Sequence, residues 1–212
     1  MIPLLGSSGF TFHRALGSTS HLYLWLDPSS PSRVPDYATH HVGVGGLVLS
    51  PCGLHILVVR EERGNYSTWK IPGGLSEAGE GLGEAAKREV MEETGVKAEA
   101  RGVLAFRHTH GSQFGRSDLY FICRMEAKTK GDGQLQVPVP QEGEIREARW
   151  ITVEEFRRTV EEDAAKPHPV MQKVMEIMSS DGGSGSLDIQ MTMVPSIVPG
   201  RLPSPVYHPP NL

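Results

Sequence analysis

The chain has 212 residues, a formal net charge of −4 and a hydrophobic fraction of 38%. This length corresponds to one domain with appendages rather than to several domains. The acidic balance argues against a nucleic-acid backbone as the main partner. No apolar run approaches the roughly 18 residues of a membrane-spanning helix, so no membrane partner is expected.

The cysteines and the first residues bear on the cellular compartment. Cys52 and Cys123 are too few for a disulfide framework and do not have a zinc-binding spacing. The first 26 residues contain one cation, Arg14, and lack the basic segment and apolar block of a secretory signal. We therefore expect a cytoplasmic protein, with the nucleus or the mitochondrion as alternatives.

Apolar periodicity and turn residues predict a chain that is mostly strand, with one early helix and two late ones. In chain order the expected strands are residues 21–26, 42–49, 55–59, 69–71, 103–108, 119–125 and 147–151. The expected helices are residues 82–94, 154–162 and 170–178, the first ended by Gly95. The strand at 69–71 is expected to stop at a turn, Pro72-Gly73-Gly74. This order predicts a mixed α+β sandwich.

Composition divides the chain into three parts. Residues 1–38 contain one predicted strand and a proline-containing linker, and residues 39–180 hold the dense strand and helix signals. Residues 181–212 begin as a flexible Gly/Ser linker and continue as a proline-rich tail, which we expect to be a wrapping or loose extension.

Three carboxylates, Glu89, Glu92 and Glu93, share one face of the predicted helix, because successive residues turn by about 100°. A solvated acidic face is the simpler interpretation, since exposed like charges cost only about 0.2–0.5 kcal/mol. The preceding glycine turn and the single cation Arg88 make the pattern more specific than that. Clustered carboxylates without Cys or His favour a hard divalent cation, Mg²⁺ or Mn²⁺, which suits hydrolysis of a phosphoanhydride.

The full segment resembles the Nudix box, Gly-x5-Glu-x7-Arg-Glu-U-x-Glu-Glu-x-Gly-U with U aliphatic. The matching residues are Gly74, Glu80, Arg88, Glu89, Glu92, Glu93 and Gly95. Resemblance to the Nudix hydrolases implies an α/β/α sandwich with a mixed central sheet and a loop–helix–loop metal site. It also implies metal-dependent cleavage of a nucleoside diphosphate linked to another moiety, with ADP-ribose or NADH as the favoured classes.

The same resemblance implies roles for single residues. Glu89 and Glu93 become the main metal ligands, assisted by Glu92. The carbonyl group of Gly73 or Gly74 is a further candidate ligand. Arg88 is expected to orient a carboxylate, and Glu80 to brace the loop before the helix.

Further segments resemble the subfamily of nucleoside diphosphate-linked moiety X motif 6: residues 42–46, 69–74 and 114–120, and Trp150. Residues 10–37 resemble the end of an additional N-terminal domain, so residues 1–38 are expected to be its remnant. The expected substrate contacts are Trp69, Lys70, Phe114, Ser117 and Asp118. Core packing of Trp69 and a strand-start turn at residues 117–118 are the alternatives. Substrate signatures known from other Nudix enzymes are incomplete, so the box indicates the reaction and not the substrate.

A loop carboxylate is the candidate general base. Glu142 and Glu144 lie in a loop where Nudix enzymes often place a further acid, and we favour Glu144 because it directly precedes a predicted strand. Helix glutamates that bind cations have depressed pKa values and are poor bases. Glu89 is the base if neither loop residue is, and a solvated loop is the alternative.

The sequence is compatible with two functions, one catalytic and one based on binding. The first is an enzyme acting on a nucleotide-derived small molecule, with neither nucleic acid nor membrane as a partner and a homodimer left open. The alternative is a regulatory Nudix module with little turnover that acts in growth control through binding.

Overall fold

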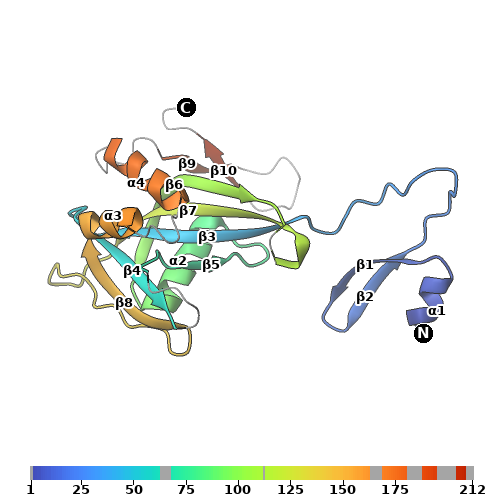
Figure 1. The fold of residues 1–212 in the computed structure, drawn as a ribbon, viewed down its shortest axis with the longest axis horizontal. Coiled ribbons are helices and arrows are strands. Elements are labelled where there is room, and N and C mark those ends of the chain that lie inside the picture. The colour runs from blue at the N-terminus through green and yellow to red at the C-terminus, as the bar shows by residue number, and fades with distance from the viewer. Residues whose placement is uncertain are drawn as a thin grey trace. The chain divides into compact units, whose positions relative to one another are not determined.

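The computed structural model describes residues 2–62, 68–111, 113–162, 169–180, 188–194 and 204–208. The chain divides into two compact units, residues 1–40 and residues 41–212 (Figure 1). The first unit contains helix α1 (Ile2–Ser7) and an antiparallel pair of strands, β1 (Thr11–Leu16) and β2 (Thr19–Tyr23). The sequence predicted a strand at 21–26 and missed β1. The two-residue turn between them, Gly17-Ser18 with Gly17 at φ 54°, is a hairpin signal that the sequence prediction did not use.

The second unit is built on a six-stranded sheet, in which β6, β7, β3, β4 and β8 lie side by side in that order and β5 pairs with β3. Its strands are β3 (His40–Leu49), β4 (His55–Glu61), β5 (Gly73–Leu75), β6 (Ala98–Thr109), β7 (Ser117–Ala127) and β8 (Ile145–Thr152). The β3–β4, β3–β5, β4–β8 and β6–β7 pairs are antiparallel.

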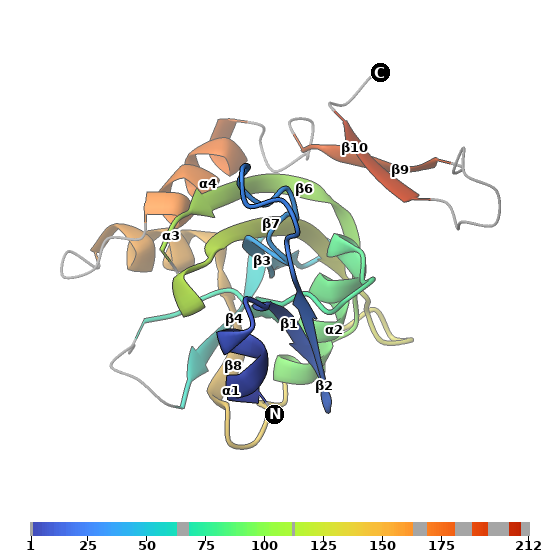
Figure 2. The same ribbon diagram turned by 90° about the vertical axis from the view of Figure 1, so that its right-hand side faces the viewer.

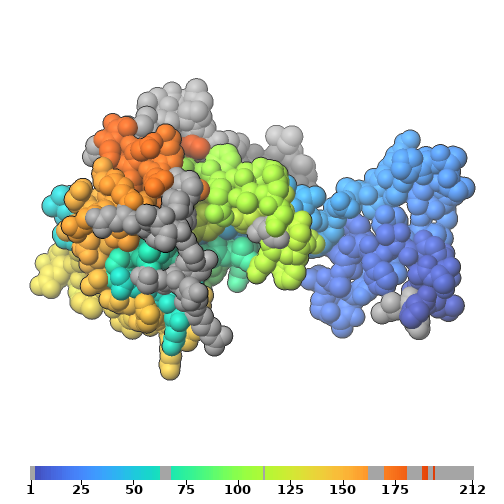
Figure 3. All heavy atoms as spheres, viewed as in Figure 1, coloured from blue at the N-terminus to red at the C-terminus, as the bar shows by residue number. Residues whose placement is uncertain are grey.

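Helices cover both faces of this sheet (Figure 2). On one face α2 (Leu82–Thr94) buries Ala85, Ala86 and Val90 against the sheet. On the other face α3 (Val153–Glu162) and α4 (Pro169–Ser180) pack on each other, as the orange atoms in Figure 3 show. Successive side chains of a strand point to opposite faces of the sheet, so each strand contributes to two hydrophobic cores, one under α2 and one under α3 and α4. The sheet is therefore apolar on both faces. The predicted α+β sandwich is confirmed.

The expected strand at residues 69–71 is wrong, and so is the turn after it. Lys70 makes only an isolated bridge with Val59, whereas Gly73 and Gly74 form β5 with Leu75. Glycine permits this because the strands approach very closely. A Cβ atom at Gly73 would lie 2.2 Å from the carbonyl oxygen of Val44.

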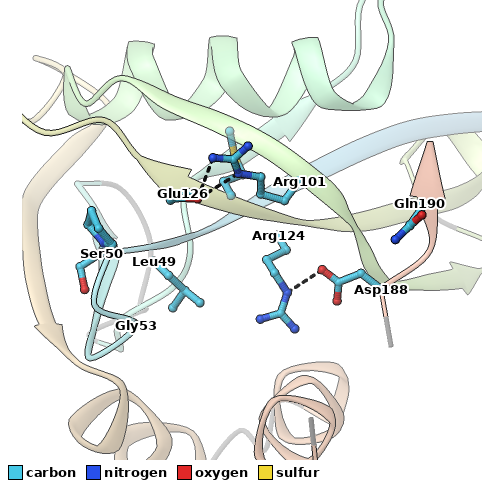
Figure 4. A pocket seen from close by; sticks show the side chains of 10 residues that line it. Leu49, Ser50, Gly53, Arg101, Arg124, Glu126, Asp188 and Gln190 are labelled. Carbon is cyan, nitrogen blue, oxygen red and sulfur yellow. Dashed lines mark hydrogen bonds and ion pairs between the residues drawn. The ribbon is translucent and has the colours of Figure 1, made fainter. Parts of the chain in front are cut away.

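The described residues of the C-terminal segment, 188–194 and 204–208, include two strands and contacts with the sheet. Strands β9 (Gln190–Val194) and β10 (Ser204–His208) form an antiparallel pair. Ile189 exchanges two backbone hydrogen bonds with Val103, at 2.8 and 2.9 Å. Beside it, Asp188 and Arg124 form a buried ion pair (Figure 4). The predicted Gly/Ser linker at 181–187 lies outside the described residues.

Candidate functional site

Helix α2 begins after Gly81 and ends at Gly95, whose φ of 67° is the left-handed conformation that glycine adopts without strain. The prediction of residues 82–94 is therefore confirmed. Small and apolar residues bury one side of the helix against the sheet. The acidic residues are thereby held along the border between the core and β5.

Glu93 is the most buried acid of the box, with 2% of its surface exposed. Its carboxylate accepts a hydrogen bond of 3.1 Å from the backbone N–H of Gly73. Burial raises the pKa of Glu93 to about 7, and the negative charges of Glu89 and Glu144 act in the same direction. The ammonium group of Lys70 and the Gly73 N–H oppose that rise in pKa. Glu93 is therefore a carboxyl group that attracts positive charge.

Glu89 lies directly against the backbone of Gly74. A Cβ atom at Gly74 would lie 2.7 Å from the carboxyl carbon and from both carboxyl oxygens of Glu89. Burial raises the pKa of Glu89, the adjacent Arg88 lowers it, and the charges of Glu92 and Glu144 raise it further. The glycine required by the box thus leaves the space that this carboxylate occupies.

Arg88 connects the acids of the site. Its Nε and Nη2 atoms donate to the two carboxyl oxygens of Glu80 at 2.9 and 3.0 Å. Its Nη1 atom donates to Glu89 at 2.8 Å and to Glu92 at 3.1 Å. Nη2 also donates to the carbonyl oxygen of Leu75 at 2.9 Å, which ties the helix to β5. This bidentate geometry is available to Arg and not to Lys.

The loop before β8 is attached to the end of α2. The N–H of Val139 donates to the carbonyl of Thr94 at 2.8 Å, and the N–H of Gln141 donates to the carbonyl of Glu93 at 3.2 Å. This attachment brings Glu144 close enough for its charge to act on the helix acids. Glu142 is exposed and precedes the turn at Gly143, where φ is 82°.

Trp69 and Lys70 lie beside this region. Trp69 is 7% exposed and belongs to the core on the α3–α4 side of the sheet. The guanidinium carbons of Arg60 and Arg149 lie 3.9 and 4.4 Å from its ring centroid. Lys70 forms an ion pair with Glu61. The geometry favours core packing of Trp69 over base stacking.

The other predicted contacts lie around the start of β7. Phe114 is 85% exposed and has a φ of 57°, an unusual value for a bulky residue. Its ring centroid is 6.1 Å from that of His41. Asp118 is buried and pairs with Arg107 at 2.7 Å. The hydroxyl group of Ser117 and Nδ1 of His110 are 2.9 Å apart.

Tyr120 is a residue of this region that the sequence analysis missed. Its ring lies on backbone that has no side chains, at Gly43 and Gly45 of β3 and at Gly73 of β5. Burial raises the pKa of its hydroxyl group above the ordinary value, and the charge of Glu93 adds to this effect. The unusual number of glycines in a buried strand is the sequence signal for such close contact.

A family model described as NUDIX domain matches residues 39–173. The chain belongs to the NUDIX domain family. The solved structure of a NUDIX hydrolase from Nitrosomonas europaea is similar in fold, with a TM-score of 0.50 and 24% identity. That similarity covers 66% of this chain and 89% of the other.

Curated relatives of this NUDIX protein share the name nucleoside diphosphate-linked moiety X motif 6. The Xenopus laevis protein is 48% identical over 128 residues, which are 59% of this chain and 58% of the relative. The Mus musculus protein is 37% identical over 198 residues, which are 92% of this chain and 59% of the relative. The chain therefore spans less than two thirds of the length of these relatives.

NUDIX hydrolases generally use divalent metals, and the donor set of this NUDIX protein suits them. Carboxylate oxygens are the ligands that hard divalent cations prefer, and Glu89 and Glu93 lie against glycine backbone that leaves them room. Among the described residues, no group of three acidic, His or Cys side chains is already arranged to hold a metal ion. Arg88 forms ion pairs with Glu89 and Glu92 in this arrangement. In the same described part of the chain, no helix has the length and apolar character needed to cross a membrane.

Proposed function

We propose that this protein hydrolyses the phosphoanhydride bond of a nucleoside diphosphate linked to another moiety, with ADP-ribose or NADH as the most favoured class. One observation carries the proposal. Two partly or fully buried carboxyl groups, Glu89 and Glu93, lie against the Gly73–Gly74 backbone at the base of an Arg88 network. Buried like charges at this spacing are unfavourable in an unliganded protein and become favourable beside a cation.

Mg²⁺ or Mn²⁺ is the cofactor that we propose for this site. Glu89 and Glu93 would be its main ligands, assisted by Glu92 and by a carbonyl group of Gly73 or Gly74. When bound, such an ion neutralises phosphate charge and lowers the pKa of water. Arg88 would orient the carboxylates of Glu89 and Glu92 through its hydrogen bonds to them.

The reaction adds water across one phosphoanhydride bond. The water oxygen bonds to one phosphorus atom in line with the bridging oxygen, and the bond from that phosphorus to the bridging oxygen breaks. The bridging oxygen leaves with the other phosphate, giving a nucleoside monophosphate and a phosphorylated second moiety. We assign the proton from water to the carboxylate of Glu144, which the loop brings near Glu89 and Glu93.

Substrate contacts are proposed at the start of β7. Phe114 offers an exposed ring for stacking, and Asp118 offers a carboxylate that Arg107 already orients. Ser117 and Lys70 are further proposed polar contacts. Trp69 is proposed to support the wall of the site from within the core rather than to stack on a base.

A panel assay tests the proposal. ADP-ribose, NADH and related dinucleotides are incubated with the full chain and Mg²⁺ or Mn²⁺, and released monophosphates are measured by phosphatase coupling. We expect turnover of at least one compound and its loss in Glu89→Gln and Glu93→Gln. The control is Glu84→Gln, an exposed acid of the same helix, which should retain the wild-type rate.

Unchanged rates in Glu89→Gln and Glu93→Gln would contradict the site assignment. Absence of turnover across the whole panel would contradict the enzymatic proposal and favour the binding module of growth control.

A further inference from the structure

The aromatic ring of Tyr120 fills the space above a glycine floor. A Cβ atom at Gly43 would lie 2.8 Å from Cδ2 of Tyr120, and one at Gly45 would lie 2.7 Å from its hydroxyl oxygen. A Cβ atom at Gly73 would lie 2.9 Å from the same oxygen. Gly45 and Gly73 are paired residues of β3 and β5. The hydroxyl end of the ring therefore lies at the rung that joins the two strands.

This rung belongs to the candidate site. The N–H of Gly73 holds the carboxylate of Glu93, so the Tyr120 hydroxyl and Glu93 contact the same short stretch of backbone. The side chain is only half-buried, although its ring packs against the core. The hydroxyl group thus lies at the border between the core and the acids of α2.

Within the part of the chain that the structure describes, no hydrogen-bond partner of the Tyr120 hydroxyl is found. A phenol is protonated at neutral pH and is therefore an available donor. The Tyr120 oxygen is not one of the buried polar atoms that lack a partner, so solvent reaches it. A ligand can therefore bring an acceptor to this donor in place of water.

The charges near the ring select the kind of acceptor. The guanidinium carbon of Arg107 lies 5.5 Å from the ring centroid of Tyr120, and Arg107 is held there by its ion pair with Asp118. The negative charges of Glu93 and Glu89 also act on the hydroxyl group, and Arg107 together with the proposed cation offsets them, so that an anionic oxygen can bind there. In the proposed substrate the diphosphate carries such oxygens, and hydrogen bonds to charged acceptors are the stronger ones.

We infer that the Tyr120 hydroxyl donates a hydrogen bond to a phosphate oxygen of the bound nucleoside diphosphate. This inference rests on the proposed function and adds a substrate-contacting residue to it. There are two competing roles. In the first, Tyr120 only supports the glycine backbone. In the second, its hydroxyl group turns toward Glu93 and affects cation binding alone.

Binding of a non-hydrolysable probe tests the inference without requiring turnover. The dissociation constant of α,β-methylene-ADP with Mg²⁺ is measured by calorimetry for the wild type and Tyr120→Phe. The matched control is Tyr37→Phe, which removes the same hydroxyl group from the other compact unit. Affinity for Mn²⁺ alone and the thermal midpoint are measured for all three proteins.

We expect Tyr120→Phe to weaken binding of the probe by about tenfold or more, because a hydrogen bond to a charged group is lost. Mn²⁺ affinity and the thermal midpoint should stay at wild-type values, and Tyr37→Phe should match the wild type throughout. Unchanged probe affinity in Tyr120→Phe would overturn the inference. Equal losses of probe and Mn²⁺ affinity would also overturn it and assign Tyr120 to the cation. Absence of probe binding by the wild type would contradict the proposed function itself.

Discussion

Glu93 is a carboxyl group whose proton affinity is set by burial, with a pKa raised from 4.5 to about 7. Between these values the folded protein binds a proton that the unfolded chain releases. The contribution of Glu93 to the free energy of unfolding is therefore constant below about pH 4.5. It falls as the pH rises from about 4.5 to 7 and is fully lost above about pH 7. The size of that loss is on the order of 3 kcal/mol in metal-free protein.

Urea denaturation at pH 5 and pH 8 in the presence of a chelator measures this loss. Glu93→Gln should remove most of the dependence, and Glu92→Gln, which alters a half-exposed acid of the same helix, should retain it. An equally steep dependence in Glu93→Gln would show that other groups cause it.

Glu144 is the residue that we expect to limit the rate of the chemical step. Glu144→Gln should lower kcat by roughly 10²–10⁴ with little change in stability, which is the usual range for loss of a general base. Initial rates on the best substrate of the panel measure this. Glu142→Gln is the matched control, because Glu142 is an exposed acid in the same loop. A loss in Glu142→Gln alone would move the base by two residues, and no loss in either would leave Glu89.

At the scale of single elements, the end of α2 depends on Gly95. Its φ of 67° is unfavourable for residues with a Cβ atom, and its N–H closes the last turn on the carbonyl of Met91. Gly95→Ala should therefore lower the free energy of unfolding by about 1 kcal/mol. The control is Gly131→Ala, at a loop position with ordinary φ and open space. Equal urea midpoints for the two variants would contradict this explanation of the helix end.

At the scale of the whole molecule, the C-terminal segment is fixed to the sheet by the buried pair of Arg124 and Asp188. Their side chains are 6% and 5% exposed, and the Nε–Oδ2 distance is 2.5 Å. Asp188→Ala should destabilise the protein by about 3–5 kcal/mol, because it leaves a buried charge without this partner. Thermal and urea unfolding measure the loss.

Arg124 and Asp188 line a cavity of about 380 Å³, and a second ion pair in its wall offers a control for that prediction (Figure 4). Arg101 and Glu126 also line it and form an ion pair at 2.7 Å, but their side chains are 57% and 45% exposed. Glu126→Ala should cost less than about 1 kcal/mol, since solvent screens exposed pairs. Equal losses in the two variants would mean that burial does not decide the value of the pair.

The sequence by itself determined the helix of the box, its end at Gly95 and the sharing of one face by Glu89, Glu92 and Glu93. These features depend on residues within a few turns of each other, so periodicity and spacing are sufficient to predict them. The strands at 42–49 and 55–59 were predictable for the same reason, because a short turn joins them.

Only the tertiary structure decided the features that join distant segments. The sequence predicted a turn at Gly73 and Gly74, but contact with β3 makes them strand β5. Three further features depend on packing between segments that are far apart in the chain. They are the burial that raises the pKa of Glu93, the position of the Tyr120 ring over Gly45 and Gly73, and the pairing of Asp188 with Arg124. Local sequence patterns do not predict which distant surface will bury a group. Burial sets the pKa of that group and its contribution to the free energy of unfolding.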